Sequence, residues 1–341
     1  MNELKATRPS DRVTIRTVAA DAGVSVAAVS KVLRNAYGVS DLLRDKVTKS
    51  IGRLGYRPSV AARGMRGQTY TIGILLIEIA NPFIPEIIDG VNAVLQPSNY
   101  KALMGMGHSA TAIEASLIES MIDNRMDGLI LIAPRMAGET LAHFARQIPV
   151  VAIGHHEASA TDFDTVNSDE RRGVAIVVEA LRQRGHSDIA MLSMEDPAAT
   201  AANVVYQREL GYMAAMQQTG LGDKARILHL PLHHQPRDAA IAAFLAMPDR
   251  PRAVFVWSDL DGILLINAAK MAGIAVPQEL AIVGYDNSPV AALPLIDLSS
   301  IDQPGPRLGA LATETLLNRI EGRTVARHLL LEPTLIERSS I

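Results

Sequence analysis

The chain of 341 residues contains no cysteine, a single tryptophan and only 4% aromatic residues. The absence of cysteine excludes disulfides, thiolate nucleophiles and cysteine-ligated zinc, and it is typical of a reducing cytoplasm. No apolar run approaches the roughly 18 residues of a membrane span. The first 12 residues are polar, without the apolar segment of a signal peptide. We therefore expect a cytoplasmic protein without contact to a membrane.

Charge is small in total but unevenly distributed along the chain. The formal net charge is −3, yet residues 1–66 contain 13 Lys and Arg against 5 Asp and Glu. The amino-terminal segment is thus +8 and the rest of the chain is −11. A cationic segment joined to an acidic body is typical of a protein that binds a polyanion such as DNA.

The cationic segment has the pattern of three short helices, expected at about 15–22, 26–33 and 41–54. Thr14, Ser25 and Ser40 are residue types that cap helix amino termini, and Gly23 permits a left-handed turn. The residues expected to face inward include Val18, Ala19, Ala22, Val29, Val32 and Leu33. A helix, a short turn with glycine and a second helix form the helix-turn-helix spacing. A generic three-helix bundle is the alternative.

In a helix-turn-helix, the second helix enters the major groove and its first side chains reach base edges. We therefore expect duplex DNA as a partner. The expected DNA contacts are Thr14, Ser25, Val26, Ala27, Ser30, Lys31 and Arg34.

Residues 58–69 separate this head from the remainder. Gly64 and Gly67 interrupt a short run of helix formers, which is too short to be a stable helix alone. Such a segment can fold when two copies pack together on DNA, and this would make it a switch. A plain flexible linker is the alternative.

Beyond residue 70, apolar runs alternate with helical patterns. Strands are expected at 72–77, 101–106, 128–132, 150–153, 189–193, 226–230, 253–256 and 280–284. Helices are expected at about 85–95, 111–124, 138–146, 170–184, 204–219, 237–246, 259–272 and 307–321. Continuous apolar strands between helices predict doubly wound parallel sheets, here in two α/β lobes. Ligands of such sheets bind outside the carboxyl ends of the strands.

Several segments together resemble the lactose-repressor (LacI/GalR) family. They are VTIRTVAADAGVSVAAVSKVL (13–33), VSDLLRDKVTKSIGRLGYRPSVAARGM (39–65), TIGILL (71–76), NPF (81–83), RGHSDIAML (184–192) and VGYDNS (283–288). The resemblance is collinear over nearly the whole chain. It implies a core with the periplasmic-binding-protein fold and chain crossings between lobes near 160–166, 288–294 and 322–326.

The resemblance implies four regions. They are a DNA-binding head at 1–57, a hinge at 58–69, an amino-terminal lobe at 70–165 and 294–324, and a carboxy-terminal lobe at 166–293 and 325–341. Two departures from the family stand in the DNA-binding part. Lys31 replaces a common arginine and is a point charge rather than a bidentate fork. Met65 replaces the usual leucine that wedges into the minor groove, which methionine can also do.

The resemblance also implies a small effector in the cleft between lobes. Arg208 and Asp286 are expected to contact it from the second lobe, and an arginine with a carboxylate can hold vicinal hydroxyls. A structural salt bridge is the alternative for this pair. Asn81 and Phe83 form a turn that offers an amide and an aromatic face, and Phe83 could instead be core. By their positions after strands, His155 and His233 are expected at the rim of the cleft, where they could contact the ligand or be exposed to solvent. Ser258 is expected to face the cleft, with Asp259 as a helix cap.

Other chemistries find weaker support. The turn GMGHSA (105–110) fits a dinucleotide fingerprint but does not open the first strand–helix unit, so a tight turn is the better interpretation. His155–His156 and His233–His234 are adjacent pairs, which rarely bind one ion, so no metal site is expected. No cofactor and no catalytic residue are predicted.

We interpret the chain as a DNA-binding transcription regulator, most simply a repressor. It would bind a pseudo-palindromic operator as a homodimer, with a tetramer left open, under control of a sugar-like effector. A sugar-binding transport protein would suit the core but not the head. An α/β enzyme is disfavoured because the chain lacks a GxSxG elbow.

Overall fold

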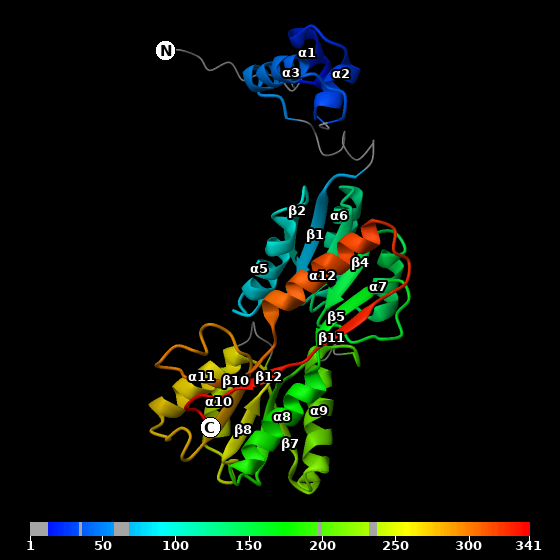
Figure 1. Cartoon of the computed structure of the whole chain (residues 1–341). Helices are drawn as coiled ribbons and strands as arrows, with labels where there is room; N and C mark the ends of the chain where they lie inside the picture. Colours follow the sequence, from blue (N-terminus) through cyan, green and yellow to red (C-terminus); the bar gives the residue numbers. More distant parts are fainter. Residues whose placement is uncertain (1–12, 34–35, 58–67, 197–199, 232–236) are drawn as a thin grey trace, which may run out of the picture. The chain divides into compact units, whose positions relative to one another are not determined.

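The three-dimensional arrangement comes from a computed structural model. It describes residues 13–33, 36–57, 68–196, 200–231 and 237–341. Contacts divide the chain into two compact units, the head at 1–69 and the core at 70–341 (Figure 1). The predicted hinge helix falls on residues 58–67, outside the described residues. Within the described residues, no helix is long and apolar enough to cross a membrane.

The head contains the three predicted helices, α1 (Ile15–Ala22), α2 (Val26–Leu33) and α3 (Asp41–Leu54). The Thr14 hydroxyl accepts a hydrogen bond from the Thr17 backbone amide, and the Thr17 hydroxyl accepts one from the Thr14 amide. Gly23 ends α1 at a φ of 58°, a left-handed conformation that glycine adopts without strain. Local sequence signals therefore set the bounds of the helix-turn-helix.

A small apolar core holds the three helices of the head together. Its buried members are Val18, Ala19, Ala22, Val29, Val32 and Val47. Leu33 was predicted to belong to it, but this is wrong because its side chain is 37% exposed at the end of α2. Asp21 on α1 joins the helices further, since it accepts hydrogen bonds from Ser50 and Arg53 of α3.

The core contains two six-stranded sheets, which define a first and a second lobe. The first sheet has the order β11-β5-β4-β3-β1-β2 and is parallel throughout. Its strands are β1 (Thr71–Leu76), β2 (Lys101–Met106), β3 (Gly128–Ile132), β4 (Val150–Ile153), β5 (Asp164–Ser168) and β11 (His328–Leu331).

The second sheet has the order β12-β10-β9-β8-β6-β7, with only β12 antiparallel to its neighbour. Its strands are β6 (Ile189–Met194), β7 (Arg226–Leu230), β8 (Ala253–Val256), β9 (Ala281–Asp286), β10 (Ser299–Asp302) and β12 (Thr334–Ile336). The two sheets confirm the predicted class of two doubly wound α/β lobes.

Helices cover both faces of each sheet. Those of the first lobe are α5 (Ile84–Leu95), α6 (Thr111–Asp123), α7 (Gly138–Ala145) and α12 (Gly305–Ile320). Those of the second lobe are α8 (Glu170–Gln183), α9 (Val204–Gln218), α10 (Asp238–Leu245) and α11 (Asp259–Met271). Alternate residues of β3 serve opposite faces, since Ile130 packs with α5 and α12 whereas Leu131 packs with α6 and α7. Burial on both faces explains why this strand is a continuous apolar run.

Each crossing between the lobes lies later in the chain than predicted, because a short strand comes before it. The chain leaves the first sheet after β5, returns after β10, and leaves it again after β11. The lobe boundaries predicted from the resemblance are therefore wrong at these strands. Residues 299–302 lie in the second sheet, whereas residues 328–331 lie in the first.

These strands escaped prediction because they are short or polar. β5 has the sequence DTVNS, although all five residues are buried. Asp164 on β5 accepts hydrogen bonds from Arg319 and Arg323. Burial alone would raise the pKa of Asp164, but these two arginines lower it below the ordinary 3.8. The polar strand β5 can be buried because arginines distant in sequence form hydrogen bonds with its carboxylate.

The close contact between α5 and α12 leads to the first testable prediction. Gly90 on α5 lies so near the Pro306 carbonyl that an added methyl group would overlap it. We expect Gly90→Ala to lower the free energy of unfolding by about 1–3 kcal/mol, because backbone atoms of α12 would have to move. Chemical denaturation followed by circular dichroism measures this. Asn92→Ala, exposed on the same helix, is the matched control, and equal stability of both variants would contradict the prediction.

Candidate functional site

The head presents part of the predicted DNA-contacting set at its surface. Thr14, Ser25, Ala27 and Lys31 are exposed, and Val26 is partly exposed. The Ser25 hydroxyl accepts a hydrogen bond from the Ala28 amide and so fixes the first turn of α2. Exposure at the start of α2 is what base contact by this helix requires.

The structure does not show the three other predicted DNA contacts, Ser30, Arg34 and Met65, as exposed side chains of the head. Ser30 is only 8% exposed and belongs to the buried side of α2, so its predicted contact with a base edge is not supported. Arg34 and Met65 lie outside the described residues. The sequence interpretation did not single out Tyr37, although its side chain is fully exposed in the segment between α2 and α3.

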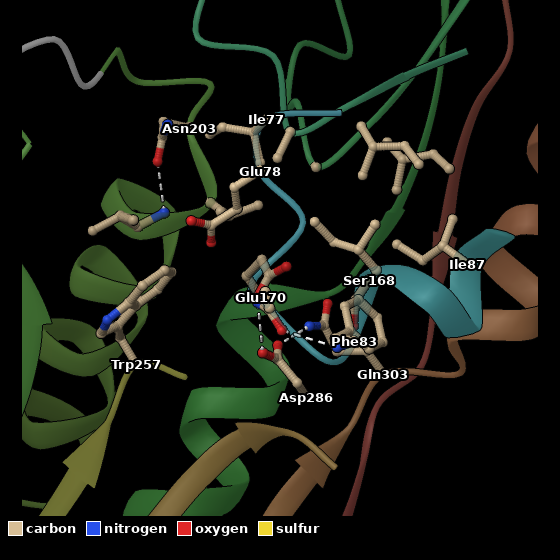
Figure 2. A pocket seen from close by; sticks show the side chains of 18 of the residues that line it. Ile77, Glu78, Phe83, Ile87, Ser168, Glu170, Asn203, Trp257, Asp286 and Gln303 are labelled. Atoms are coloured by element: carbon tan, nitrogen blue, oxygen red, sulfur yellow. Dashed lines mark hydrogen bonds between the residues drawn. The ribbon is translucent and has the colours of Figure 1, made fainter. Parts of the chain in front are cut away.

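The core contains a cavity of about 110 Å³ to which both lobes contribute (Figure 2). It lies at the carboxyl ends of central strands, where the fold predicts a ligand site. Four of the predicted effector contacts line it, namely Asn81, Phe83, Arg208 and Asp286. Asn81 and Asp286, which lie 205 positions apart in the sequence, thus contact each other at the cavity.

Arg208, on α9, is the central buried cation of the second-lobe side. Its side chain is 4% exposed, and its Nε donates to Glu170 Oε2 at 2.7 Å. The guanidinium carbon lies 3.7 Å from the centre of the Tyr285 ring, and Nη1 donates to the Trp257 carbonyl oxygen. A second carboxylate, Asp286, is 3.7 Å away. These contacts satisfy a charge that would be costly to bury alone.

Asp286 ends β9 and faces the cavity. Its Oδ1 accepts a hydrogen bond from Gln303 Nε2 at 2.7 Å, and its Oδ2 accepts one from Asn81 Nδ2 at 3.3 Å. Figure 2 shows Asp286, Glu170 and Gln303 pointing toward one another at one end of the cavity. Complete burial raises the pKa of Asp286 to about 8, although Arg208 opposes this shift.

Several contacts join the two lobes around the cavity. The Asn81–Asp286 hydrogen bond is one of them. A second is the ion pair between Arg135, which follows β3, and Asp196, which follows β6. Both of these side chains are almost completely buried, at 4% and 1% exposure. Backbone contacts near His155 and Asn203 form a third link. The cavity is therefore bounded by polar contacts whose two partners belong to different lobes.

His155 does not line the cavity, contrary to the prediction. Its ring is buried against Phe163 and lies 3.1 Å from Glu157, and burial lowers its pKa below 6.5. Among the described residues, no cluster of three potential metal ligands includes it or any other histidine. The second predicted histidine, His233, falls outside the described residues.

The predicted roles of Ser258 and Asp259 are both wrong, because Ser258 caps the helix and neither residue lines the cavity. The Ser258 hydroxyl accepts a hydrogen bond from the Asp261 amide and caps α11, and Ser258 is fully buried away from the cavity. Asp259 accepts hydrogen bonds from the Ser300 hydroxyl at 2.5 Å and the Ser288 amide at 2.6 Å. It therefore ties β10 to the loop after β9 instead of capping the helix.

The sequence interpretation missed four prominent lining residues, Arg135, Glu170, Trp257 and Gln303. Each lies at or next to the carboxyl end of a strand, at the start of a helix or in a crossing between lobes. Trp257 follows β8 directly, so its position as the residue after a buried strand was a usable signal. Gln303 had none, because the strand before it was not recognised.

The turn at 105–110 does not offer a phosphate site. The amides of Gly107 and Ser109 donate to the carbonyls of Leu76 and Ile77, and the Ala110 amide donates to Gly107. A dinucleotide fingerprint needs such amides for the pyrophosphate. The geometry therefore favours the interpretation as a tight turn.

Titration of Asp286 gives the second prediction. Its pKa lies above the ordinary 3.8, so between about pH 4 and pH 8 the unfolded chain releases a proton that the folded protein retains. The free energy of unfolding should thus fall as the pH rises from about 5 to about 8, and Asp286→Asn should weaken this dependence. Denaturation curves across that range are the measurement.

Asp297→Asn is the matched control for this prediction. Hydrogen bonding to Ser339 holds the pKa of Asp297 below 3.8, so this group is already ionised throughout the tested range. Identical pH dependence in the parent protein and in Asp286→Asn would show that Asp286 does not retain its proton.

Comparison with known proteins finds similarity both in the head and in the core. The family model described as "Bacterial regulatory proteins, lacI family" matches residues 14–59, and one described as "Periplasmic binding protein-like domain" matches residues 178–341. The "HTH-type transcriptional repressor PurR" of Erwinia tasmaniensis is 31% identical over 334 residues, or 96% of each chain.

Two solved structures extend this similarity to the fold. The lac repressor dimer bound to operator and the anti-inducer ONPF has a TM-score of 0.82 at 22% identity, covering 97% of this chain and 99% of that one. The complex of the transcriptional regulator CelR with cellobiose has a TM-score of 0.69 at 26% identity, covering 97% and 100%. With a helix-turn-helix head, a two-lobed core and a relative matching over nearly its whole length, this chain belongs to the lacI family of bacterial regulatory proteins and is a DNA-binding transcriptional regulator of that family.

Proposed function

We propose that the protein acts as a homodimer on a pseudo-palindromic operator, and that a hydroxyl-bearing, sugar-like effector in the core cavity controls its operator affinity. A symmetric dimer presents two heads to two half-sites, so the operator should share the two-fold symmetry. The effector class is supported by the arginine and carboxylate groups of the cavity, and by the cellobiose complex of CelR.

The observation that carries the proposal is the cavity lining from both lobes, with Asn81 of the first lobe bonded to Asp286 of the second. A ligand that touches both sides favours one arrangement of the lobes, and it shifts the equilibrium only by its differential affinity. Coupling of this kind is typically worth about 1–3 kcal/mol and is reciprocal. Operator DNA should therefore change effector affinity by the same factor.

The operator can be identified by selecting binding sequences from a random DNA pool with the purified full-length protein. The proposal expects a selected sequence with two-fold symmetry and salt-sensitive binding. A selected sequence without symmetry, or binding with no sequence preference, would contradict it.

The third prediction concerns Lys31 on the exposed side of α2. If its ammonium group contacts a base, Lys31→Ala should weaken binding to the selected operator by about 1–3 kcal/mol and leave binding to random DNA nearly unchanged. Fluorescence anisotropy over a salt series measures both affinities. Lys49→Ala is the matched control, because this exposed lysine lies on α3 and pairs with Asp45. Equal losses on operator and random DNA would identify Lys31 as a phosphate contact.

The fourth prediction concerns Arg208. Arg208→Lys keeps the buried positive charge but loses the planar fork that joins Glu170 and the Trp257 carbonyl. Operator binding without effector should stay close to that of the parent protein, whereas the change caused by an active sugar should fall at least tenfold in potency. Anisotropy titrations of operator complexes with that sugar provide the measurement.

Arg172→Lys, an exposed substitution of the same type on α8, is the control. A full effector response in Arg208→Lys would remove Arg208 from the effector site and leave it a structural salt bridge.

A further inference from the structure

The chain enters the core through a strained residue. Tyr70 has a φ of 54°, in the left-handed region that residues with bulky side chains seldom adopt. It stands between the segment 58–69, which the sequence predicts to be a hinge, and β1, which begins at Thr71. A conformation of this kind persists only where surrounding contacts hold it, and such residues are concentrated at functional sites.

Contacts from two neighbouring strands hold Tyr70 in this conformation. Its amide donates to Asp127 Oδ2 at 2.6 Å, and its carbonyl oxygen accepts from the Lys101 amide at 2.9 Å. Its ring meets the Tyr100 ring edge-on, with 5.3 Å between the ring centres. Lys101 begins β2 and Asp127 directly precedes β3, and these two strands flank β1 in the sheet. We define Tyr70, Tyr100, Lys101 and Asp127 as the entry clamp.

The sheet itself does not require the side-chain contacts of the entry clamp. Backbone pairing already holds β1 from its first residue, because Thr71 stands opposite Lys101 and its carbonyl oxygen accepts from the Asp127 amide at 2.8 Å. The Asp127 carboxylate and the Tyr100 ring act one residue earlier, on Tyr70. They therefore determine the direction in which the preceding chain leaves the sheet.

The entry clamp is attached to a rigid part of the first lobe. Five of the six residues of β1 and all five residues of β3 are buried. The two strands are paired along their length, from Ile72 opposite Gly128 to Leu76 opposite Ile132. Close-packed strands of this kind move as one body. A direction fixed by the clamp is therefore fixed with respect to the whole lobe.

We propose that the entry clamp positions the DNA-binding head, because it limits the directions in which each hinge segment leaves its core. This inference rests on the proposed function, in which two heads of a homodimer bind two half-sites. Once one head is bound, the other meets its half-site at an effective concentration that falls as the connection becomes looser. The clamp thus raises the affinity for the whole operator although none of its residues needs to touch DNA.

Tyr70→Gly tests this role in the full-length protein. Glycine adopts a φ of 54° without strain, but it lacks the ring contact and gives access to many other conformations. Fluorescence anisotropy at low salt can compare the selected operator with a duplex that carries one half-site. We expect the affinity for the whole operator to fall about tenfold and the half-site affinity to change by less than about twofold. A folding defect would instead lower both affinities.

A pair of Asp127 variants tests the same role without changing the chain between head and core. Asp127→Ala removes the oxygen that accepts from the Tyr70 amide, so it should lower the ratio of operator to half-site affinity as Tyr70→Gly does. Asp127→Asn retains a carbonyl oxygen that can accept this bond, so it should preserve the ratio of the parent protein.

His108→Gly is the matched control for Tyr70→Gly. His108 is exposed and has a φ of 51°, so glycine relieves the same kind of strain there. It follows β2 and does not connect the head to the core, so the ratio should stay at the parent value. Circular dichroism checks that each variant is folded.

Three results would overturn the inference. They are an unchanged ratio in folded Tyr70→Gly, an equal fall of the ratio in His108→Gly, and equal losses on both duplexes in Asp127→Ala. If Tyr70→Gly does not fold, the two Asp127 variants decide, and identical ratios for them would reject the clamp. A selected operator without two-fold symmetry would contradict the proposed function itself, whereas a symmetric operator with an unchanged ratio rejects only the positioning role.

Discussion

The buried guanidinium of Arg208 determines how the second lobe's side chains are arranged at the cavity. A charge taken out of water must be matched by partners of good geometry, and each of its partners is thereby fixed. Glu170 is held at the start of α8, the Trp257 carbonyl at the end of β8, and the Tyr285 ring lies against the cation. Without this cation, two carboxyl groups would face each other in a buried space. The geometry of the cavity is therefore inseparable from the packing of the lobe.

The first lobe contributes in a different way. Its strands β1, β3 and β4 are apolar because helices bury both faces, and aliphatic residues also stand at the ends of these strands that meet the cavity. The turn around Asn81, the loop around Arg135 and the segment around His155 carry polar groups across to the second lobe. The second lobe thus contributes buried charged groups to the cavity, and the first lobe contributes the aliphatic ends of its central strands.

Much of this could be predicted from the sequence where local signals are strong. Capping residues and Gly23 located the head helices, and each predicted core strand and helix lies within two residues of its observed bounds. Prediction failed where distant contacts decide the outcome. β5 is polar and buried because Arg319 and Arg323 neutralise Asp164 from 155 and 159 residues away. Asp259 does not cap its helix because the Ser288 amide and the Ser300 hydroxyl donate to it instead, and local patterns cannot reveal these donors.

The ion pair between Arg135 and Asp196 has a consequence for how this protein can change over evolutionary time. The two residues lie 61 positions apart on different lobes, and both are buried. Loss of either partner alone would leave an uncompensated charge, at a typical cost of about 3–5 kcal/mol, whereas replacement of both by apolar residues can be neutral. Descendants should therefore keep the pair or lose it as a unit, so that the two positions share one history although they belong to separate halves of the fold.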